Sequence, residues 1–181
     1  SNSSLLTGNY ITNCTEGIQV WQGSTNNTVT ENTITFCDDV AIRLQYADNN
    51  TVTRNDVSHS GIGTSVYVAN NNTITQNNYF NNIQQLPMSE WYAKTFGYNG
   101  SINFINNNYW SNYNGTDSNG DGYGDTPYLI DEKNQDNNPI LFPITIEIIP
   151  EFPSWICVMF LVVTFFVIAF KTSLFTYSEH H

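Results

Sequence analysis

The heptapeptide Asn26-Asn27-Thr28-Val29-Thr30-Glu31-Asn32 returns twice with little change, as Asn49-Asn50-Thr51-Val52-Thr53-Arg54-Asn55 and as Asn71-Asn72-Thr73-Ile74-Thr75-Gln76-Asn77. A more divergent copy, Ser3-Ser4-Leu5-Leu6-Thr7-Gly8-Asn9, precedes them, and the steps between the four copies are 23, 23 and 22 residues. A fixed period of this size is typical of a solenoid, in which each repeat packs only on its neighbours. The repeat therefore decides the fold class.

Each period contains two short runs in which apolar and polar residues alternate. Thr, Val, Ile and Tyr at a period of two indicate strands with one buried face, and Gly and Asn between the runs indicate bends. The predicted inward residues are Leu6, Val29, Val52 and Ile74; Ile11, Ile34, Val57 and Tyr79; and Ile18/Val20, Ile42/Leu44 and Val66/Val68. We expect an all-β, right-handed parallel β-helix of about four to five coils with a C-terminal cap loop, followed by a single transmembrane α-helix.

Stacked coils place equivalent positions about 4.8 Å apart. Asn9, Asn32, Asn55 and Asn77 then form a predicted ladder in which side-chain amides pair along the axis. The same alignment sets Glu31 beside Arg54, an opposite-charge pair.

Cys14 and Cys37 also fall side by side in this alignment. Their Cα atoms would lie within the range of a disulfide, but stacked side chains point the same way and hold the Cβ atoms apart. We expect a buried pair of thiols rather than a bridge. Three cysteines do not make a disulfide framework, and Cys157 lies in an apolar stretch as a small hydrophobe.

The repeat weakens after residue 80. Asn77-Asn78-Tyr79-Phe80 is echoed by Asn107-Asn108-Tyr109-Trp110, 30 residues later. The excess predicts an insertion at 86–96, where Trp91 and Tyr92 would either fold over a coil or form a ligand lip. The predicted organisation is coils at 1–116, an acidic cap loop at 117–142, a linker at 143–151, a transmembrane helix at 152–171 and a short tail at 172–181.

The run from Phe152 to Phe170 carries no charge, and its 19 residues would span about 28 Å as a helix, close to the ~30 Å hydrocarbon core. Trp155 and Lys171 suit the two membrane interfaces. A buried core helix is the alternative, but a small β-helix has no pocket for one. Lys171 favours a cytoplasmic C-terminus, which places the β-helix on the extracytoplasmic side of a single-pass protein.

Sixteen acidic and five basic residues give a net charge of −11. Nucleic acid is not an expected partner, because neutralising phosphates needs clustered Lys and Arg. The chain opens on Ser1-Asn2-Ser3-Ser4 without an initiator Met, so we expect the end of a longer or processed protein. Seven asparagines begin glycan-acceptor triplets: Asn2, Asn13, Asn26, Asn49, Asn71, Asn99 and Asn114. The ladder accounts for Asn26, Asn49 and Asn71, which leaves the other four as candidates for glycan attachment.

The stretch from Asp117 to Asp125 places oxygen ligands at alternate positions of a Gly-rich loop. Such side chains can converge on one cation, and carboxylate and carbonyl oxygens suit Ca²⁺ rather than copper or zinc. The predicted ligands are Asp117, Asn119, Asp121, Asp125 and the backbone carbonyl of Tyr123. Tyr128 stands where an EF-hand has a bidentate Glu, so Asp131 or Asp136 would complete the shell; the alternative is a solvated turn.

The segment from Asn108-Tyr109-Trp110 through Gly120-Asp121-Gly122-Tyr123-Gly124-Asp125-Thr126-Pro127-Tyr128, with Asp136 and Pro139 beyond it, resembles the C-terminal end of NosD-type β-helix proteins. The resemblance covers about residues 1–142 and implies a parallel β-helix. The family includes a periplasmic accessory protein for copper-site maturation and shares its repeat with carbohydrate-binding and sugar-hydrolysing modules. Pro150-Glu151-Phe152-Pro153-Ser154 is similar to the C-terminal anchors of archaeal surface proteins.

Three functions compete. The first is a non-catalytic surface module that binds a glycan, the cell envelope or a partner protein, with exposed aromatics such as Trp21, Tyr46 and Trp91 suited to sugar rings. The second is a polysaccharide-active lyase, hydrolase or epimerase, for which Glu16 and Asp39, with Asp38 beside them, are the candidate carboxylates; the alternative is that they face solvent. The third, copper delivery, is implied by the resemblance alone, because the soft or imidazole donors are scattered: His59, Met88, Cys14 and Cys37.

Overall fold

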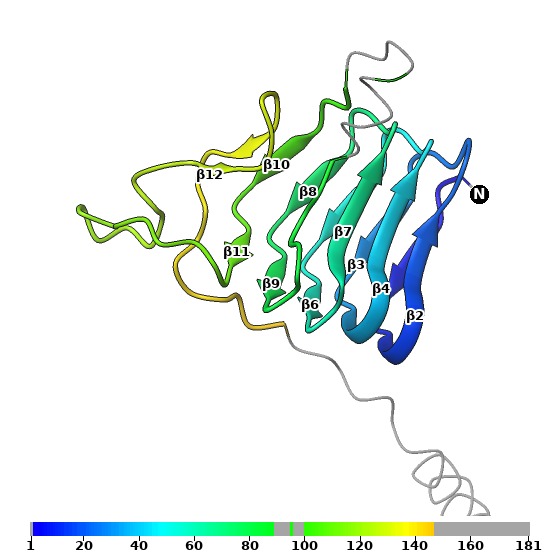
Figure 1. Ribbon diagram of the computed structural model, residues 1–181, viewed down its shortest axis with the longest axis horizontal. Helices are drawn as coiled ribbons and strands as arrows, with labels where there is room; N and C mark the ends of the chain where they lie inside the picture. The colour runs from blue at the N-terminus through cyan, green and yellow to red at the C-terminus, as the bar shows by residue number, and fades with distance from the viewer. Residues whose placement is uncertain (1, 89–94, 96–99, 147–181) are drawn as a thin grey trace, which may run out of the picture. The chain divides into compact units, whose positions relative to one another are not determined.

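Successive turns of the chain lie on one another in register, as the repeat predicts (Figure 1). The computed structural model describes residues 2–88, 95 and 100–146, all within one compact unit, Ser1–Ile148. Every strand pair between coils is parallel, which makes the fold a parallel β-solenoid. It has about three regular turns rather than four to five, because beyond β9 only the short strands β10 and β11 are added before the cap; the right-handed crossover stays a prediction.

Two sheets run along the solenoid. The first has the order β1-β3-β5-β8-β10, with the strands β1 (Leu5–Thr7), β3 (Thr28–Thr30), β5 (Thr51–Thr53), β8 (Thr73–Thr75) and β10 (Phe104–Asn106). The second has the order β2-β4-β6-β9-β11, with β7 also paired to β4. Its strands are β2 (Tyr10–Val20), β4 (Thr33–Gln45), β6 (Asp56–Ser58), β7 (Ile62–Tyr67), β9 (Asn78–Phe80) and β11 (Tyr109–Trp110).

The core consists of the inward residues of each strand, stacked like on like. Val29, Val52 and Ile74 are fully buried in register, as are Ile34, Val57 and Tyr79 in the second sheet. The predicted stacking of Val66 on Ile42 and of Val68 on Leu44 is wrong by two residues. Thr64 lies on Ile42 and Val66 on Leu44, because β4 carries one more residue before Val40 than the next coil carries before Ile62.

Thr64 is therefore a buried polar residue in an apolar column, and its hydroxyl hydrogen-bonds the hydroxyl of Tyr79 at 2.9 Å. The later repeat also shifts by one residue. Trp110 pairs with Tyr79, and Asn108 continues the ladder from Asn77, so this step is 31 residues rather than 30. The inward side chain decides the register, because only Trp110 faces the core.

Two asparagine ladders bracket the strands of the first sheet. In the predicted ladder, the backbone N–H and Nδ2 of each Asn donate to Oδ1 of the Asn in the next coil at 2.8–3.1 Å. This ladder runs Asn9, Asn32, Asn55, Asn77, Asn108 and ends on Asp136. A second ladder, which the sequence reading missed, runs Asn27, Asn50, Asn72, Asn103 and Asn134.

The C-terminal end of the solenoid is closed by a cap. β12 (Tyr128–Leu129) and β13 (Gln135–Asp136) pair antiparallel. Tyr79, Trp110 and Tyr128 form a continuous stack, with ring centroids 4.7 and 4.3 Å apart and planes 8° and 5° from parallel. The chain then runs back to Ile144, whose N–H and carbonyl both bond the side-chain amide of Asn78.

Several predictions fall on residues that the structure does not describe: most of the insertion at 86–96, with Trp91 and Tyr92, and the transmembrane helix at 152–171. Within the described residues, no helix is long and apolar enough to cross a membrane.

Candidate functional site

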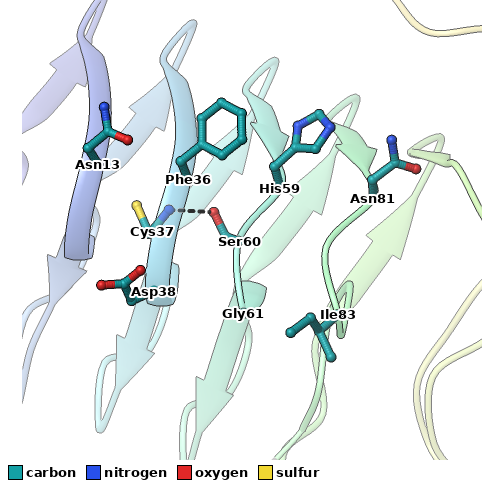
Figure 2. Close-up of a pocket in the computed structure, with 9 residues that line it drawn as sticks. All are labelled: Asn13, Phe36, Cys37, Asp38, His59, Ser60, Gly61, Asn81 and Ile83. Atoms are coloured by element: carbon teal, nitrogen blue, oxygen red, sulfur yellow. Dashed lines mark hydrogen bonds between the residues drawn. The ribbon is translucent and has the colours of Figure 1, made fainter.

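Each regular coil turns at bends where one residue takes a left-handed backbone and projects outward, and the next residue projects inward. One row of such residues crosses four coils at the bend after the first part of the second sheet (Figure 2). Its members have φ between 49° and 55°: Asn13, Phe36, His59 and Asn81. Because the coils are stacked, this backbone geometry aligns four outward side chains along the solenoid axis.

A cavity of about 600 Å³ opens on this row. It is lined by Asn13, Phe36, Cys37, Asp38, His59, Ser60, Gly61, Asn81 and Ile83. We call it the cross-coil groove. Its floor carries an aromatic pair, since the rings of Phe36 and His59 stack with centroids 5.0 Å apart and planes 22° from parallel. Phe36 is 53% exposed and Ile83 88% exposed, so apolar surface is open to solvent there.

The wall of the groove comes from an irregularity in the second coil. Cys37 precedes Val40 by three residues, whereas in the next coil Ser60 precedes Ile62, the residue paired with Val40, by only two. The extra residue bulges the segment of Asp38 outward. Gly61 allows the bulge, because a Cβ there would lie 2.6 Å from the carbonyl oxygen of Asp38.

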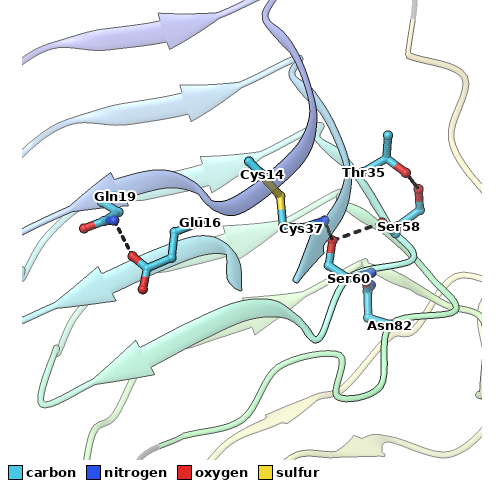
Figure 3. Close-up of a disulfide and its surroundings, with 8 residues drawn as sticks. All are labelled: Cys14, Glu16, Gln19, Thr35, Cys37, Ser58, Ser60 and Asn82. Carbon is cyan, nitrogen blue, oxygen red and sulfur yellow. Dashed lines mark hydrogen bonds between the residues drawn. A yellow bond between two sulfur atoms is a disulfide. The ribbon is translucent and has the colours of Figure 1, made fainter. Parts of the chain in front are cut away.

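Behind the floor, Cys14 and Cys37 form a disulfide (Figure 3). The expectation of two stacked thiols is therefore wrong. The Cα atoms lie 4.6 Å apart, inside the disulfide range, and the strand is irregular from Cys14 to Glu16, so the two side chains do not keep the orientation of a regular stack. Ser60 and Asn82 continue the column, with Cys37 N–H donating to Ser60 Oγ at 3.1 Å and Ser60 N–H to Asn82 Oδ1 at 3.0 Å.

The candidate catalytic carboxylates are brought together by a cation. Arg43 binds Glu16 at 2.7 Å and Asp39 at 2.9 Å, and Gln19 also donates to Glu16. The 23-residue period alone would set Glu16 beside Asp39. Instead Glu16 pairs with Val40, because of the extra residue in the second coil. Two carboxylates that share one guanidinium form an ion-pair cluster on the outer face of the sheet.

The acidic loop folds around its first carboxylate. Asp117 accepts backbone N–H bonds from Gly120, Asp121 and Gly122 at 2.7–3.1 Å, and the side chains of Asn119 and Asp121 bond each other. Three of the five predicted ligands are thus drawn together.

Asp125, another predicted ligand, is tied to the start of the loop. Its carboxylate accepts bonds from Ser118 and Thr116, and these bonds, those from Ser118 first, lower the pKa of Asp125. Tyr123, the fifth, donates its N–H to Asp121.

Asp131 and Asp136 do not complete a shell around this loop. Asp131 holds Asn134 and the N–H of Lys133. Asp136 is fully buried in the cap, where its oxygens accept bonds from Asn107, Asn108, Trp110 and Asn138. Both carboxylates are used to end the solenoid, so that expectation is wrong.

The other sequence candidates are spread over the surface. Trp21 is 49% exposed at the end of β2, and Tyr46 packs edge-on against Tyr67, at a different bend from the cross-coil groove. Asn26, Asn49 and Asn71 are exposed left-handed bend residues. The buried ladder is formed by their neighbours, so the bend rather than the ladder explains these three asparagines.

The sequence matches one protein-family model, described as periplasmic copper-binding protein (NosD). The match covers residues 1–115, more than half of the chain. The chain belongs to the NosD family. Comparisons with curated proteins and with solved structures give no match.

Among the described residues of this NosD-family chain, the donors do not fit a copper centre. Cys14 and Cys37 are bonded to each other, and His59 stands in the groove beside a phenyl ring. Within residues 2–88, 95 and 100–146, no three His, Cys, Asp or Glu side chains are grouped to hold a metal ion. Copper needs clustered imidazole, thiolate or thioether donors, so no copper chemistry is derived for these residues.

Sequence reasoning missed the cross-coil groove. Asn13, Phe36, His59 and Asn81 recur at steps of 23, 23 and 22 residues, the same period as the ladder. This period is the signal that could have found them. The four positions carry three different residue types, so a search for a conserved residue at this period does not find the row.

Proposed function

We propose that this chain is a membrane-anchored, extracytoplasmic β-helix module that binds a neutral glycan across the coils, in the groove lined by Asn13, Phe36, His59 and Asn81. The observation that carries the proposal is the stacked row of outward side chains over an open cavity of about 600 Å³. The row extends about 14 Å over three coil steps, which suits a short stretch of sugar rings.

The chemistry of the row supports a sugar ligand. The exposed ring of Phe36 and the imidazole of His59 form the aromatic floor of the groove, and the apolar faces of sugar rings pack on such aromatic surfaces. At the two ends of this aromatic pair, the amides of Asn13 and Asn81 can each donate to and accept from hydroxyl groups. The backbone N–H of Asn81 donates to Ser111 Oγ at 2.9 Å, which fixes this end of the row.

Charge favours a neutral chain over an acidic one. The groove lining contains the carboxylate of Asp38 and no Lys or Arg, and the chain carries a net charge of −11. An acidic polysaccharide would be repelled at this surface. The polysaccharide-active alternative is less favoured, because both candidate carboxylates are held in ion pairs with Arg43.

The family and the disulfide both support an extracytoplasmic location. The matched family is described as periplasmic, and disulfides persist mainly in oxidising compartments. The segment 152–171, uncharged from Phe152 to Phe170, supplies the proposed single-pass anchor. Together these place the groove on the extracytoplasmic side, where envelope glycans are available to it.

The test is a screen of the full-length chain, in detergent micelles, against a panel of neutral and acidic glycans, followed by calorimetric titration of the best ligand. Phe36→Ala should weaken binding about tenfold, which corresponds to ~1.4 kcal/mol. Phe104→Ala is the matched control, because Phe104 is similarly exposed at 61% but lies on β10 in the other sheet. Equal affinity for both variants, or no neutral ligand, would refute the groove as a glycan site.

We further propose that the acidic loop holds a structural Ca²⁺ with Asp117, Asn119, Asp121, Asp125 and the carbonyl of Tyr123. The convergence of Asp117, Asn119 and Asp121 supports it, and an ion at hard oxygen donors would brace the exposed end of the cap. Calorimetry should show Ca²⁺ binding that Asp121→Ala removes and Asp38→Ala leaves unchanged. Absence of heat on titrating the unaltered chain would end this proposal, and elemental analysis that finds copper would reopen copper delivery.

A further inference from the structure

The outer face of the first sheet carries a regular array of threonines that the groove does not use. In β3, β5 and β8 the central residue is fully buried and its two neighbours are half-buried, so both neighbours face outward. They are Thr28, Thr30, Thr51, Thr53, Thr73 and Thr75. Their strands pair in register, Thr28 with Thr51 with Thr73 and Thr30 with Thr53 with Thr75. We call this surface the threonine face.

The threonine face repeats in two dimensions. Neighbouring threonines lie about 4.8 Å apart along the axis and about 6.6 Å apart along each strand. Each three-residue strand is bracketed by two buried ladder asparagines, for example Asn50 before β5 and Asn55 after it. The ladders fix both ends of every strand, so the array is rigid before any ligand arrives and little entropy is lost on binding.

Its chemistry is uniform and uncharged. The hydroxyls of Thr53 and Thr75 lie 3.4 Å apart. Within the part of the chain that the structure describes, the hydroxyls of Thr28, Thr51 and Thr73 face outward without a hydrogen bond to the protein. None of the six positions is charged, although the chain carries −11. The flanking Glu31 and Arg54 pair with each other at 3.4 Å.

A flat lattice of hydroxyl and methyl groups is poorly suited to a peptide or a single glycan chain, which gain affinity from pockets and aromatic anchors. It suits a partner that itself repeats in two dimensions and carries no charge. Short hydroxyls can hold bridging waters, while the methyl groups between them favour ordered water over their surface. In a tetrahedral water network, hydrogen bonds of about 2.8 Å set second-neighbour oxygens about 4.6 Å apart, close to the spacing of the threonines along the solenoid axis.

We propose that the threonine face binds the surface of ice, by ordering a layer of water that joins the crystal lattice. This activity is separate from glycan binding in the cross-coil groove, because the two surfaces lie on different sheets. The periodicity, the rigidity and the absence of charge all belong to the same six threonines.

The test is partition into slowly grown ice, together with microscopy of ice-crystal shape and recrystallisation, using the full-length chain in micelles and empty micelles as the blank. The unaltered chain should be enriched in ice and should inhibit recrystallisation. Thr53→Tyr, which raises a bulky side chain from the centre of the face, should reduce both to the blank. Thr12→Tyr is the matched control on β2 of the other sheet and should keep both activities.

Thr53→Val separates surface chemistry from folding, since it keeps a small side chain. Thr53→Val retains the shape and should lose part of the activity, and circular dichroism should show an unchanged fold. Exclusion of the unaltered chain from ice, or equal activity of Thr53→Tyr and Thr12→Tyr, would overturn the proposal. Binding of the face to crystalline polysaccharide without ice activity would overturn it too, and would assign the face to that solid instead. Glycan binding in the groove would be untouched by any of these results.

Discussion

Asn55, in the middle of the first ladder, and Asp136, at its C-terminal end, occupy equivalent positions but differ by one atom type. Asn55 accepts two bonds at Oδ1 from Asn32 and donates from Nδ2 to Val29, Thr53 and Asn77. Asp136 only accepts, from Asn107, Asn108, Trp110 and Asn138. A residue inside the stack has coils on both sides, whereas the last residue has only donors facing it.

The difference shows how a solenoid of identical turns can be ended. A middle position needs an amide, because it must both accept and donate. At the end, exchanging the amide nitrogen for oxygen satisfies every donor of the last coil and leaves no donor that requires a further coil. The column of Cys14, Cys37, Ser60 and Asn82 ends differently, since its first link is a covalent disulfide.

The largest effect is expected in the middle of the core. Val52→Asp places a carboxylate at a position with no exposed surface, and burial of an unpaired charge should cost more than about 4 kcal/mol. Urea unfolding followed by circular dichroism should show cooperative loss of the coils. Thr53→Asp, one residue along and facing outward, is the control, and equal loss in both variants would mean that the inward register is assigned wrongly.

The next prediction places the carboxylate that ends the ladder at a position in its middle. Asn55→Asp removes two amide donors and sets a carboxylate against the oxygens of Val29, Thr53 and Asn77. The free energy of unfolding should fall by about 3 kcal/mol. Asn49→Asp makes the same exchange at an exposed left-handed bend and should change little.

The third prediction concerns removal of the disulfide that begins the column of Cys14, Cys37, Ser60 and Asn82. The Cys14–Cys37 disulfide closes a separation of 23 residues, and its loss should lower the free energy of unfolding by ~3 kcal/mol. Urea unfolding with and without a dithiol reductant measures this. A Cys14→Ala, Cys37→Ala double variant should be insensitive to the reductant; sensitivity there would assign the effect to another site.

Asp136→Asn tests the C-terminal end of the ladder. The –NH₂ group of the new amide would then face an N–H donor of Asn107, Asn108 or Trp110. That buried donor would lose its acceptor. The expected loss is about 2 kcal/mol. Asp38→Asn, at an exposed carboxylate, is the control; an unaffected Asp136→Asn variant would show that the end tolerates an amide as the middle does.

The smallest effect concerns Asp56, beside the segment that returns from the cap. Burial raises the pKa of Asp56 above its usual 3.8, and the amide of Asn78 offsets this in part. The folded state then binds the proton more tightly than the unfolded state, so this contribution to stability is present below pH 3.8 and is lost as pH rises through the raised pKa. Thermal unfolding across pH 3 to 7 should show this slope in the unaltered chain and not in Asp56→Asn.

Much of the fold could be predicted because it depends on the repeat. The period gave the parallel stack, and the letters Asn9, Asn32, Asn55 and Asn77 gave one ladder, which the structure confirms. The Glu31–Arg54 pair is confirmed as well. These features follow from register alone, since stacking places like positions one strand spacing apart.

The failures arise where one coil differs in length from the next. The extra residue before Val40 moves Glu16 away from Asp39, shifts the column through Thr64 and Val66, and raises the wall of the groove. The disulfide depends on the same irregular stretch. A one-residue bulge leaves almost no trace in a repeat read by period, yet it redirects every side chain around it.

The sequence by itself determined that the chain stacks in parallel turns, because only that arrangement buries a column of apolar residues repeated at a fixed interval. The tertiary structure alone decided which side chains meet across the coils: Phe36 with His59, Cys14 with Cys37, Arg43 with two carboxylates, and Asp136 with the donors of the last turn. These contacts join residues that are distant in the chain, and their geometry depends on bends and bulges that shift atoms by less than one strand spacing.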